Sequence, residues 1–502
     1  MRYWKTVCLG CALFAVTAIA SPAQTFTTLV SFDGDATGSQ PIAPLVQGLD
    51  GNFYGTTYTG GTQDYGTVFK VTPSGKLTVL HSFCSLKNCA DGESPWGGLV
   101  LASNGNFYGT ASGGGAGSIY CLAGCGTVFE ITPAGRLTTV YSFCAEAKCA
   151  DGNYPEAGLV QGADGSFYGT TYGLGPNEWG TVFKLTPSGK LTTLHSFCSE
   201  ANCADGSYPK SALMQATDGN LRGTTGGGGL SDVCPPGCGT VFEITPEGKL
   251  TTLYEFCSEA NCSDGDGPIG GLVQATNGSS YGTTGSGGSP SVCETGCGTV
   301  FEISPTGKLN TLYSFCSQTN CTDGYRPVGL VQATNGNFYG VTAYGGTSAV
   351  CTTGGYGGCG TVFEISPAGN LTTLYSFCPQ ASCADGAFPL AGLLQTTNGD
   401  FYGTTPIGGA NNGGTVFSLS VGLNPFVETL PASGKVGGKV IILGNHLTGA
   451  TTVSFHGTAA VFAVVSDTEI TAEVPTGATT GRVTVETTSG TLKSNKQFQI
   501  AP

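Results

Sequence analysis

Hydrophobic and polar residues alternate over short stretches along most of this chain. Phe167–Thr171, Thr181–Leu185 and Leu191–Phe197 are examples, rich in aromatic and β-branched residues and bounded by glycine, asparagine, serine or proline. A period of two residues in such short runs is typical of strands, and no helical period competes with it. The pattern therefore predicts an all-β fold.

One short motif divides most of the chain into repeats. The string Gly-Thr-Val-Phe occurs seven times at spacings of 54 to 62 residues, beginning at Gly66, Gly126, Gly180, Gly239, Gly298, Gly360 and Gly414. Repetition at a nearly fixed period indicates a repeat architecture, in which each unit covers the hydrophobic face of its neighbour.

Each repeat contains four expected strands. In the third repeat they are Gly158–Gln161, Phe167–Thr171, Thr181–Leu185 and Leu191–Phe197, and Asp164-Gly165 marks a hairpin turn between the first two. Radial packing of four-stranded sheets gives a β-propeller. We therefore predict that residues 25–422 form a seven-bladed β-propeller of four-stranded blades.

The two ends of the repeat region predict how the ring closes. Thr25–Phe32 resembles a fourth strand but precedes the first repeat, whereas Thr415–Leu419, the third strand of the last repeat, has no fourth strand after it. The N-terminal strand should complete the last blade and remove an open sheet edge. An open solenoid is the alternative architecture, and it would not need this offset.

The cysteines beyond residue 23 fall into ten local pairs. Each pair lies either in the loop after a second strand or in the crossing after a fourth strand. In this strand order both connections lie at the same face, so we expect all ten pairs at that face. The pairs are Cys84/Cys89, Cys121/Cys125, Cys144/Cys149, Cys198/Cys203, Cys234/Cys238, Cys257/Cys262, Cys293/Cys297, Cys316/Cys321, Cys351/Cys359 and Cys378/Cys383. An even count in an exported chain favours disulfides. Zinc is the alternative, but we expect each pair to stand alone with no histidine nearby.

The N-terminus and the charge balance indicate the compartment. Residues 1–23 have the features of a signal peptide: Arg2 and Lys5, an apolar run over Val7–Ile19, and Ala18-Ile19-Ala20 as a cleavage site. No later stretch is long and apolar enough to span a membrane. Acidic residues outnumber basic ones 33 to 19, which argues against nucleic acid and anionic membranes as partners. We expect a secreted or periplasmic protein and a monomer.

Residues 423–502 form a second expected domain, without cysteine. Short β-branched strands are expected at Val440–Leu443, Thr452–Phe455, Glu469–Val474 and Gly481–Val485. Their partial period-two alternation predicts a second all-β domain.

Both parts resemble known families. The Leu-Val-Gln strand, Phe-Tyr-Gly-Thr-Thr, Gly-Thr-Val-Phe and Thr-Pro-x-Gly-Lys-Leu are similar to the GloVer-type tandem repeat of bacterial exported proteins, a family that implies no settled activity. Ser433-Gly434, Ile442–Asn445, Val453–Phe455 and Thr480–Val483 resemble the IPT/TIG domain. This resemblance implies that residues 423–502 form an immunoglobulin-like β-sandwich. Such domains accompany surface proteins and carbohydrate-active enzymes. The chain also resembles streptogramin-lyase-like propellers, more weakly, but it lacks the histidine cluster that lyase activity would need.

One acidic motif recurs on the cysteine-bearing face. Asp-Gly-x-x-Pro occurs six times, at Asp91, Asp151, Asp205, Asp264, Asp323 and Asp385. Each aspartate can order its own loop as an Asx-turn. The alternative is a ring of carboxylates that binds calcium or a cationic group, so calcium is the one cofactor that we keep open; we expect no other.

Aromatic residues accompany this motif, at Trp96, Tyr154, Tyr208, Tyr325 and Phe388, and Trp179 lies in a neighbouring loop. Aromatic rings beside carboxylates suit stacking on sugars, and they suit packing between loops equally well. His81 and His195 take the place of a strand tyrosine and are expected to be structural. Among the acids, only Asp232 and Glu294 lie in unique loop positions.

These observations predict an exported, non-catalytic binding or adhesion protein. Its disulfide-braced face would hold a glycan or an extracellular protein. A carbohydrate-active enzyme or lyase on the same face is the first alternative, and it would need a carboxylate pair. A structural envelope protein is the second.

Overall fold

The structure is a computed structural model. It describes residues 24–115, 117, 119–231, 233–234, 237–288, 293, 295–351, 357–379 and 382–501. The predicted signal peptide, residues 1–23, and the two acids Asp232 and Glu294 lie outside the described residues.

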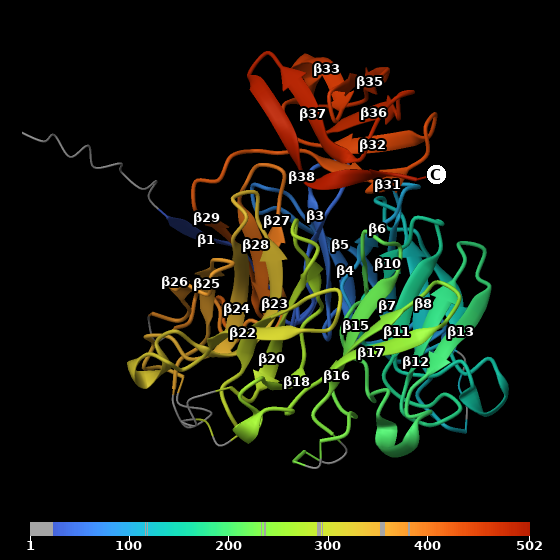
Figure 1. The fold of residues 1–502 in the computed structure, drawn as a ribbon, viewed down its shortest axis with the longest axis vertical. Coiled ribbons are helices and arrows are strands. Elements are labelled where there is room, and N and C mark those ends of the chain that lie inside the picture. Colours follow the sequence, from blue (N-terminus) through green and yellow to red (C-terminus); the bar gives the residue numbers. More distant parts are fainter. Residues whose placement is uncertain are drawn as a thin grey trace, which may run out of the picture.

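Within the described residues, the repeats form seven antiparallel sheets (Figure 1). The first strands are β2 (Val46–Gln47), β6 (Val100–Leu101), β10 (Val160–Gln161), β14 (Met214–Gln215), β19 (Val273–Gln274), β23 (Tyr325–Gln332) and β27 (Leu394–Gln395). The second strands are β3 (Phe53–Thr57), β7 (Phe107–Ala111), β11 (Phe167–Thr171), β15 (Leu221–Thr225), β20 (Ser280–Ser286), β24 (Phe338–Tyr344) and β28 (Phe401–Thr405).

The third strands are β4 (Thr67–Val71), β8 (Thr127–Ile131), β12 (Thr181–Leu185), β16 (Thr240–Ile244), β21 (Thr299–Ile303), β25 (Thr361–Ile365) and β29 (Thr415–Ser420). The fourth strands are β5 (Leu77–Ser82), β9 (Leu137–Ser142), β13 (Leu191–Ser196), β17 (Leu250–Glu255), β22 (Leu309–Ser314) and β26 (Leu371–Ser376). In the fifth repeat, β18 (Asp266–Pro268) also pairs with β20.

The N-terminal strand pairs with the last repeat, as the strand order predicts. β1 (Thr25–Ser31) lies antiparallel to β29, in a sheet of order β1-β29-β28-β27. Phe26 of β1 stacks on Tyr375 of the sixth repeat, with ring centroids 3.8 Å apart. The N-terminal strand β1 is thus held by the last two repeats.

The repeated sequence has a packing reason in each sheet. Gly169 of β11 faces the ring of Phe183 on β12, and a Cβ atom at this glycine would lie 2.6 Å from the ring. The following Thr171 bonds to Thr181 through their hydroxyl groups at 2.9 Å, with both side chains buried. The glycine of Phe-Tyr-Gly-Thr-Thr therefore makes room for the phenylalanine of Gly-Thr-Val-Phe.

Each sheet contacts the next through side chains of its second strand. Tyr54 stacks on Phe107 at 4.1 Å, and the same Tyr–Phe contact joins most neighbouring repeats. The fourth repeat has Arg222 instead, and its guanidinium donates to Ser280 of the fifth repeat at 3.2 Å. Tyr402 of the seventh repeat lies 4.1 Å from Phe53 of the first.

The C-terminal part forms two further sheets, of order β30-β32-β36-β35 and β31-β38-β37-β33-β34. The predicted strands are present; the elements are β30 (Glu428–Leu430), β31 (Ser433–Gly434), β32 (Lys439–Leu443), η6 (Leu447–Gly449), β33 (Ala450–Phe455), β34 (Thr458–Ala459), β35 (Phe462–Val464), β36 (Glu469–Glu473), β37 (Gly481–Thr487) and β38 (Gly490–Ile500). Ile442, Val453, Ile470 and Val485 are buried between the sheets. This is a β-sandwich with its own core.

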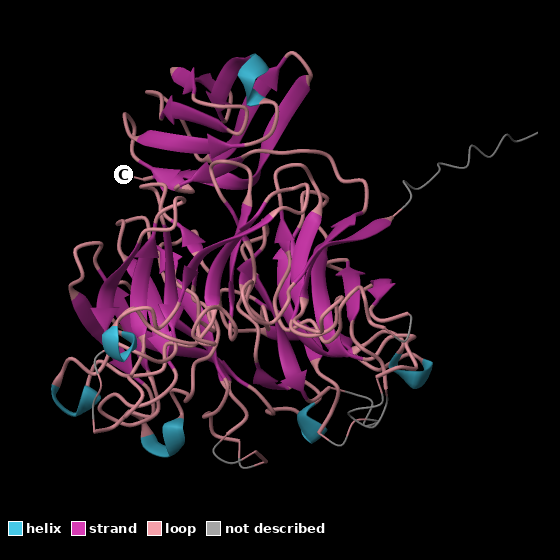
Figure 2. Ribbon diagram, turned by 180° about the vertical axis from the view of Figure 1, so that it is seen from behind, coloured by secondary structure: helices cyan, strands magenta, loops and turns pink. Residues whose placement is uncertain are grey.

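The sandwich lies at one end of the repeat region, and the short helices of the cysteine loops lie at the other (Figure 2). Thr468 donates to the carbonyl of Leu49 at 2.6 Å, and Asn445 donates to Thr397 at 2.8 Å. Leu443 of the sandwich is buried in the same cluster as Tyr54 of the first repeat. The sandwich therefore packs on the short turns between first and second strands.

Candidate binding face

We call the end of the repeat region opposite the sandwich the braced face. It consists of the loops between second and third strands and the crossings from each fourth strand to the next repeat. It carries five short 3-10 helices within the described residues: η1 (Lys87–Cys89), η2 (Ala147–Cys149), η3 (Ala201–Cys203), η4 (Ala260–Cys262) and η5 (Thr319–Cys321).

The ten disulfides expected from the sequence are present among the described residues. They join Cys84 to Cys89, Cys121 to Cys125, Cys144 to Cys149, Cys198 to Cys203, Cys234 to Cys238, Cys257 to Cys262, Cys293 to Cys297, Cys316 to Cys321, Cys351 to Cys359 and Cys378 to Cys383. Disulfides in this number indicate an extracytoplasmic protein.

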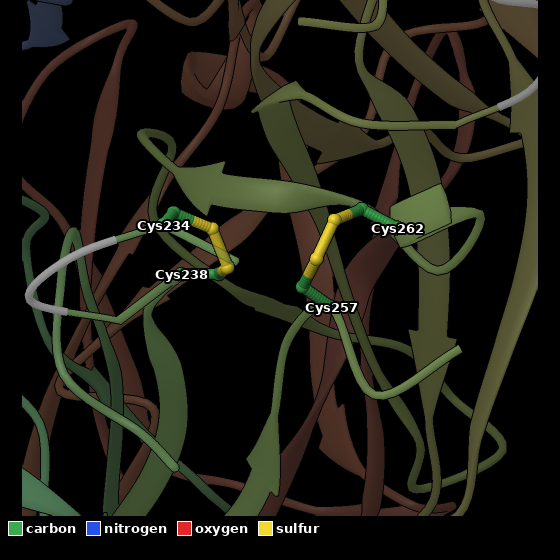
Figure 3. Close-up of side chains that lie close together, drawn as sticks. All are labelled: Cys234, Cys238, Cys257 and Cys262. Atoms are coloured by element: carbon green, nitrogen blue, oxygen red, sulfur yellow. A yellow bond between two sulfur atoms is a disulfide. The ribbon is translucent and has the colours of Figure 1, made fainter. Parts of the chain in front are cut away.

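The expectation that each pair stands alone is wrong. In four repeats the cysteines of the loop and of the crossing come together within 4.8 Å; the groups are Cys121/Cys125/Cys144, Cys234/Cys238/Cys257/Cys262, Cys293/Cys297/Cys316 and Cys351/Cys359/Cys378/Cys383. Figure 3 shows two disulfides of the fourth repeat facing each other. The sequence spacing hides this contact because it depends on how two separate segments pack.

The repeated aspartates point into their own loops. Asp91, Asp151, Asp205, Asp264 and Asp323 are buried, and Asp385 is half-buried. Asp151 accepts hydrogen bonds from the hydroxyl of Tyr141 at 2.9 Å and the backbone N–H of Ala145 at 3.0 Å. Equivalent backbone bonds recur at Asp91, Asp205, Asp264 and Asp323. At Asp385 the backbone N–H of Cys378 donates instead, because the next residue is Pro379. This is how an aspartate orders a loop.

Two histidines take the tyrosine's place in this arrangement. His81 Nε2 lies 2.9 Å from Asp91, and His195 Nε2 lies 2.9 Å from Asp205. Burial by itself raises the pKa of Asp205, but hydrogen bonds from His195, Ser199 and the backbone prevail and lower it to about 2. Both histidines are therefore engaged by structural carboxylates, as expected from the sequence.

The predicted aromatic residues differ in exposure. Trp96 is 44% exposed and Tyr154 38% exposed, Tyr208 and Phe388 are half-buried, and Tyr325 is buried. Each of Trp96, Tyr208, Tyr325 and Phe388 contacts a tyrosine that sequence analysis missed: Tyr58, Tyr172 or Tyr344. Tyr58 and Tyr172 directly follow the second strand and Tyr344 is its last residue, so all three lie just before the glycine-rich loop. Their position just before the glycine-rich loop is the sequence signal that could have identified them as candidate site residues.

Three of these aromatic residues have an unfavourable backbone conformation. Tyr154, Tyr208 and Phe388 have φ angles of 52°, 56° and 56°. The left-handed region is costly for bulky residues, whereas glycine adopts it freely. The fifth repeat has Gly267 at this position, also with a φ of 56°. Gln40, Ser94 and Arg326 adopt the same conformation at this position, with φ angles of 56°, 52° and 56°, so the conformation belongs to the loop of every repeat and does not mark out the aromatic residues.

One aromatic group of the braced face, which we call the Tyr172 cluster, consists of Glu156, Tyr172, Trp179, Tyr208 and Lys210. Tyr172 stacks on Tyr208 with centroids 5.0 Å apart, and Trp179 meets Tyr208 edge-on at 4.8 Å. The ammonium of Lys210 lies 4.4 Å from the centre of the Tyr172 ring. The cluster distinguishes this junction from the other repeats, because no other repeat combines these residues in its sequence.

Glu156 gives the Tyr172 cluster a carboxyl group. Burial raises the pKa of Glu156, and the charge of Lys210 partly offsets this effect. An acid, a base and three rings thus meet at the junction of the third and fourth repeats. Such a surface can stack on a flat apolar face and exchange hydrogen bonds at its edge.

The fold and the braced face define a class: an extracytoplasmic, disulfide-rich all-β repeat protein with a C-terminal sandwich. The profile of the Gloeobacter/Verrucomicrobia repeat matches residues 12–161, 122–353 and 318–457. The chain belongs to this family. The IPT/TIG domain matches residues 426–500. Both resemblances inferred from the motifs are confirmed.

Other comparisons are more remote. No protein of curated function matches the sequence. A fungal alcohol oxidase of the AA5 family is 12% identical with a TM-score of 0.49, covering 95% of this chain and 99% of that one. The extracellular domain of BT4673 from B. thetaiotaomicron is 10% identical with a TM-score of 0.49, covering 94% and 58%. Hydrazine synthase of Kuenenia stuttgartiensis is 12% identical with a TM-score of 0.47, covering 77% and 97%. These likenesses carry no argument about function.

No helix in the described part of the chain is long and apolar enough to cross a membrane.

Proposed function

We propose that this protein is a secreted or periplasmic, non-catalytic binding protein whose braced face holds a glycan. The observation that carries the proposal is the Tyr172 cluster, with its stacked rings flanked by a carboxyl and an ammonium group. The rings offer apolar surface to the C–H face of a sugar, while Glu156 and Lys210 offer an acceptor and donors to its hydroxyls.

We further infer that the seven sheets are blades of a β-propeller, over residues 25–422, that β1 closes. Two observations support this inference. Tyr402 of the seventh repeat contacts Phe53 of the first, and Gln47 of the first donates to Thr397 of the seventh at 3.1 Å. A ring would carry the aromatic residues of successive repeats around one face, where Trp96, Tyr154, Tyr208, Tyr325 and Phe388 would share a multivalent surface.

The placement of the sandwich also supports this choice of face. Its contacts with Leu49 and Thr397 lie on the opposite end of the repeats. Loops that a rigid scaffold holds at a free surface are the usual location of binding residues. In this account the repeated aspartates stabilise their own loops, and we propose no calcium site at them. They are Asp91, Asp151, Asp205, Asp264, Asp323 and Asp385.

A glycan array of residues 24–502 tests the proposal, with wild type and with Trp96→Ala and Tyr208→Ala variants, each in calcium and in a chelator. We expect saturable binding to one glycan class, unaffected by the chelator and reduced at least tenfold by Tyr208→Ala. An array without binding under either condition would reject the glycan and favour a protein partner or a structural role.

One observation favours catalysis as the second candidate. A glutamate whose pKa is raised by burial can act as a general acid, so Glu156 could serve a glycoside hydrolase. Such an enzyme needs a second carboxylate about 5–10 Å away. Release of reducing ends from the bound glycan, abolished by Glu156→Gln, would establish this alternative; binding without turnover would reject it.

A further inference from the structure

The four-cysteine group of the fourth repeat has the geometry of a potential ligand set. Cys234 and Cys238 come from the loop after β15, and Cys257 and Cys262 from the crossing after β17 (Figure 3). Their four sulfur atoms all lie within 4.8 Å of one another. Cys238 and Cys257 are buried, and Cys234 and Cys262 are partly buried. The two disulfides therefore form one compact sulfur cluster.

The cluster is accessible from the braced face. A hollow of about 660 Å³ is lined by Cys234, Cys262 and Cys293, together with Val233 and Asp266. It extends between the cysteine loops of the fourth and fifth repeats. A small reductant can therefore reach one cysteine of each disulfide, Cys234 and Cys262, without unfolding the sheets.

Four thiolates at this separation suit one class of ion. Zn²⁺ and its soft analogue Cd²⁺ bind cysteine thiolates in a tetrahedron, with Zn–S distances of about 2.3 Å. The sulfur atoms of such a tetrahedron lie roughly 3.8 Å apart, because its edge is about 1.6 times the metal–ligand distance. Sulfur atoms that already lie within 4.8 Å need only small movements of their loops to reach this geometry.

We propose that the cysteine clusters of the fourth and sixth repeats have two states: disulfide-braced when oxidised, and a tetrathiolate site for Zn²⁺ or a similar soft cation when reduced. A dithiol supplies the electrons. Each disulfide takes up two electrons and two protons while the dithiol becomes a disulfide, and cation binding then displaces the four thiol protons. The sixth-repeat cluster consists of Cys351, Cys359, Cys378 and Cys383.

The chain contains matched controls for this proposal. Cys198 and Cys203 of the third repeat form the same local disulfide around η3, but no second cysteine pair joins them within the described residues. In the second and fifth repeats only three sulfur atoms fall within 4.8 Å of one another. For these cysteine groups we expect two tight metal sites per reduced chain, weaker metal binding at the three-sulfur groups and no metal binding at the Cys198/Cys203 pair.

Cadmium titration of the reduced protein tests the proposal. Residues 24–502 are reduced without oxygen by a dithiol, which is then removed, and circular dichroism verifies that the β fold persists. Cd²⁺ is added with a competing chelator, and the ultraviolet absorbance of Cd²⁺–thiolate bonds counts the ions bound. We expect two per chain, one in the Cys234→Ser/Cys238→Ser variant, and two in the Cys198→Ser/Cys203→Ser control.

A residue-level measurement complements the count. Bound Zn²⁺ should protect Cys234, Cys238, Cys257 and Cys262 from alkylation at least tenfold, whereas Cys198 and Cys203 react at the same rate with or without the ion. Equal protection of all cysteines, no protection, or a stoichiometry that the Cys234→Ser/Cys238→Ser variant leaves unchanged would overturn the proposal. Loss of the fold on reduction would also overturn it, because the cluster requires both loops in place.

Discussion

The two ends of the repeat region are built from the same strands but differ in their loops. On the end covered by the sandwich, two-residue strands such as β10 turn tightly into the next strand, and Thr468 and Asn445 bond to these turns. On the braced face, long loops are held by disulfides and by buried aspartates. One end of the repeat region therefore attaches the sandwich, whereas the loops at the other end can vary in sequence without disturbing the sheets.

The largest expected effect concerns attachment of the sandwich. Leu443 is buried in a cluster with Tyr54, and Leu49 and Leu430 pack against it. Leu443→Ala should lower the free energy of unfolding by about 2–5 kcal/mol, because it leaves a cavity. Thermal unfolding and limited proteolysis near residues 422–427 measure it. Loss of glycan binding in a folded Leu443→Ala variant would contradict the separation of the two ends.

The next largest change in stability is expected from a substitution of Asp205, on the braced face. Asp205→Asn weakens bonds to His195, Ser199 and the backbone and should destabilise the protein by about 1–3 kcal/mol. The lowered pKa of Asp205, about 2, predicts a pH dependence. The carboxylate stabilises the fold fully above about pH 4, and this contribution is lost as the pH falls through 2.

Acid unfolding curves measure the difference. Wild type should lose more stability between pH 4 and pH 2 than Asp205→Asn, since the variant lacks the titrating group. Parallel curves over this range would show that Asp205 does not hold its loop through the charged form.

A disulfide provides a smaller, local effect. The Cys198→Ser/Cys203→Ser variant opens a short loop, so it should cost about 2 kcal/mol or less. The loop around η3 should become sensitive to proteases while the sheets remain intact. Cleavage sites mapped by mass spectrometry measure this change. Global unfolding of the variant would show that the disulfides hold the scaffold itself.

The smallest effect is expected at Lys210. Lys210 is exposed, and its ammonium lies over the Tyr172 ring, where such a contact contributes about 0.5–1 kcal/mol. Lys210→Met should change the thermal midpoint little and weaken glycan binding several-fold, because a hydrogen-bond donor is lost. Calorimetric titration with the array-selected glycan measures the affinity, and an unchanged affinity would exclude Lys210 from the site.

Much of the fold follows from local sequence signals. Phe167–Thr171 and Thr181–Leu185 are strands over the predicted residues, and β13 ends one residue before its predicted end. These predictions succeed because alternation and turn residues act within a few positions of each other. The disulfide pairing was equally predictable, because each disulfide joins two cysteines that lie close together in the sequence.

The site was less predictable because its contacts are long-range. Tyr172 lies in the third repeat and Tyr208 in the crossing to the fourth, and only the packing of two repeats brings their rings together. Cys238 and Cys257 likewise come together only through the packing of two separate segments, here within the fourth repeat. The attachment of the sandwich to the short turns could not be predicted, since Thr468 and Leu49 belong to separate domains.

The central claim is that the braced face, and not the sandwich end, binds the glycan. Tyr208→Gly tests it most directly: the variant removes a ring of the Tyr172 cluster, while glycine relieves the φ of 56° instead of straining the backbone. Thr468→Ala is the matched variant at the other end. The glycan array should show binding lost in Tyr208→Gly, with unfolding at or above the wild-type temperature, and retained in Thr468→Ala. Binding retained in Tyr208→Gly and lost in Thr468→Ala would contradict the account.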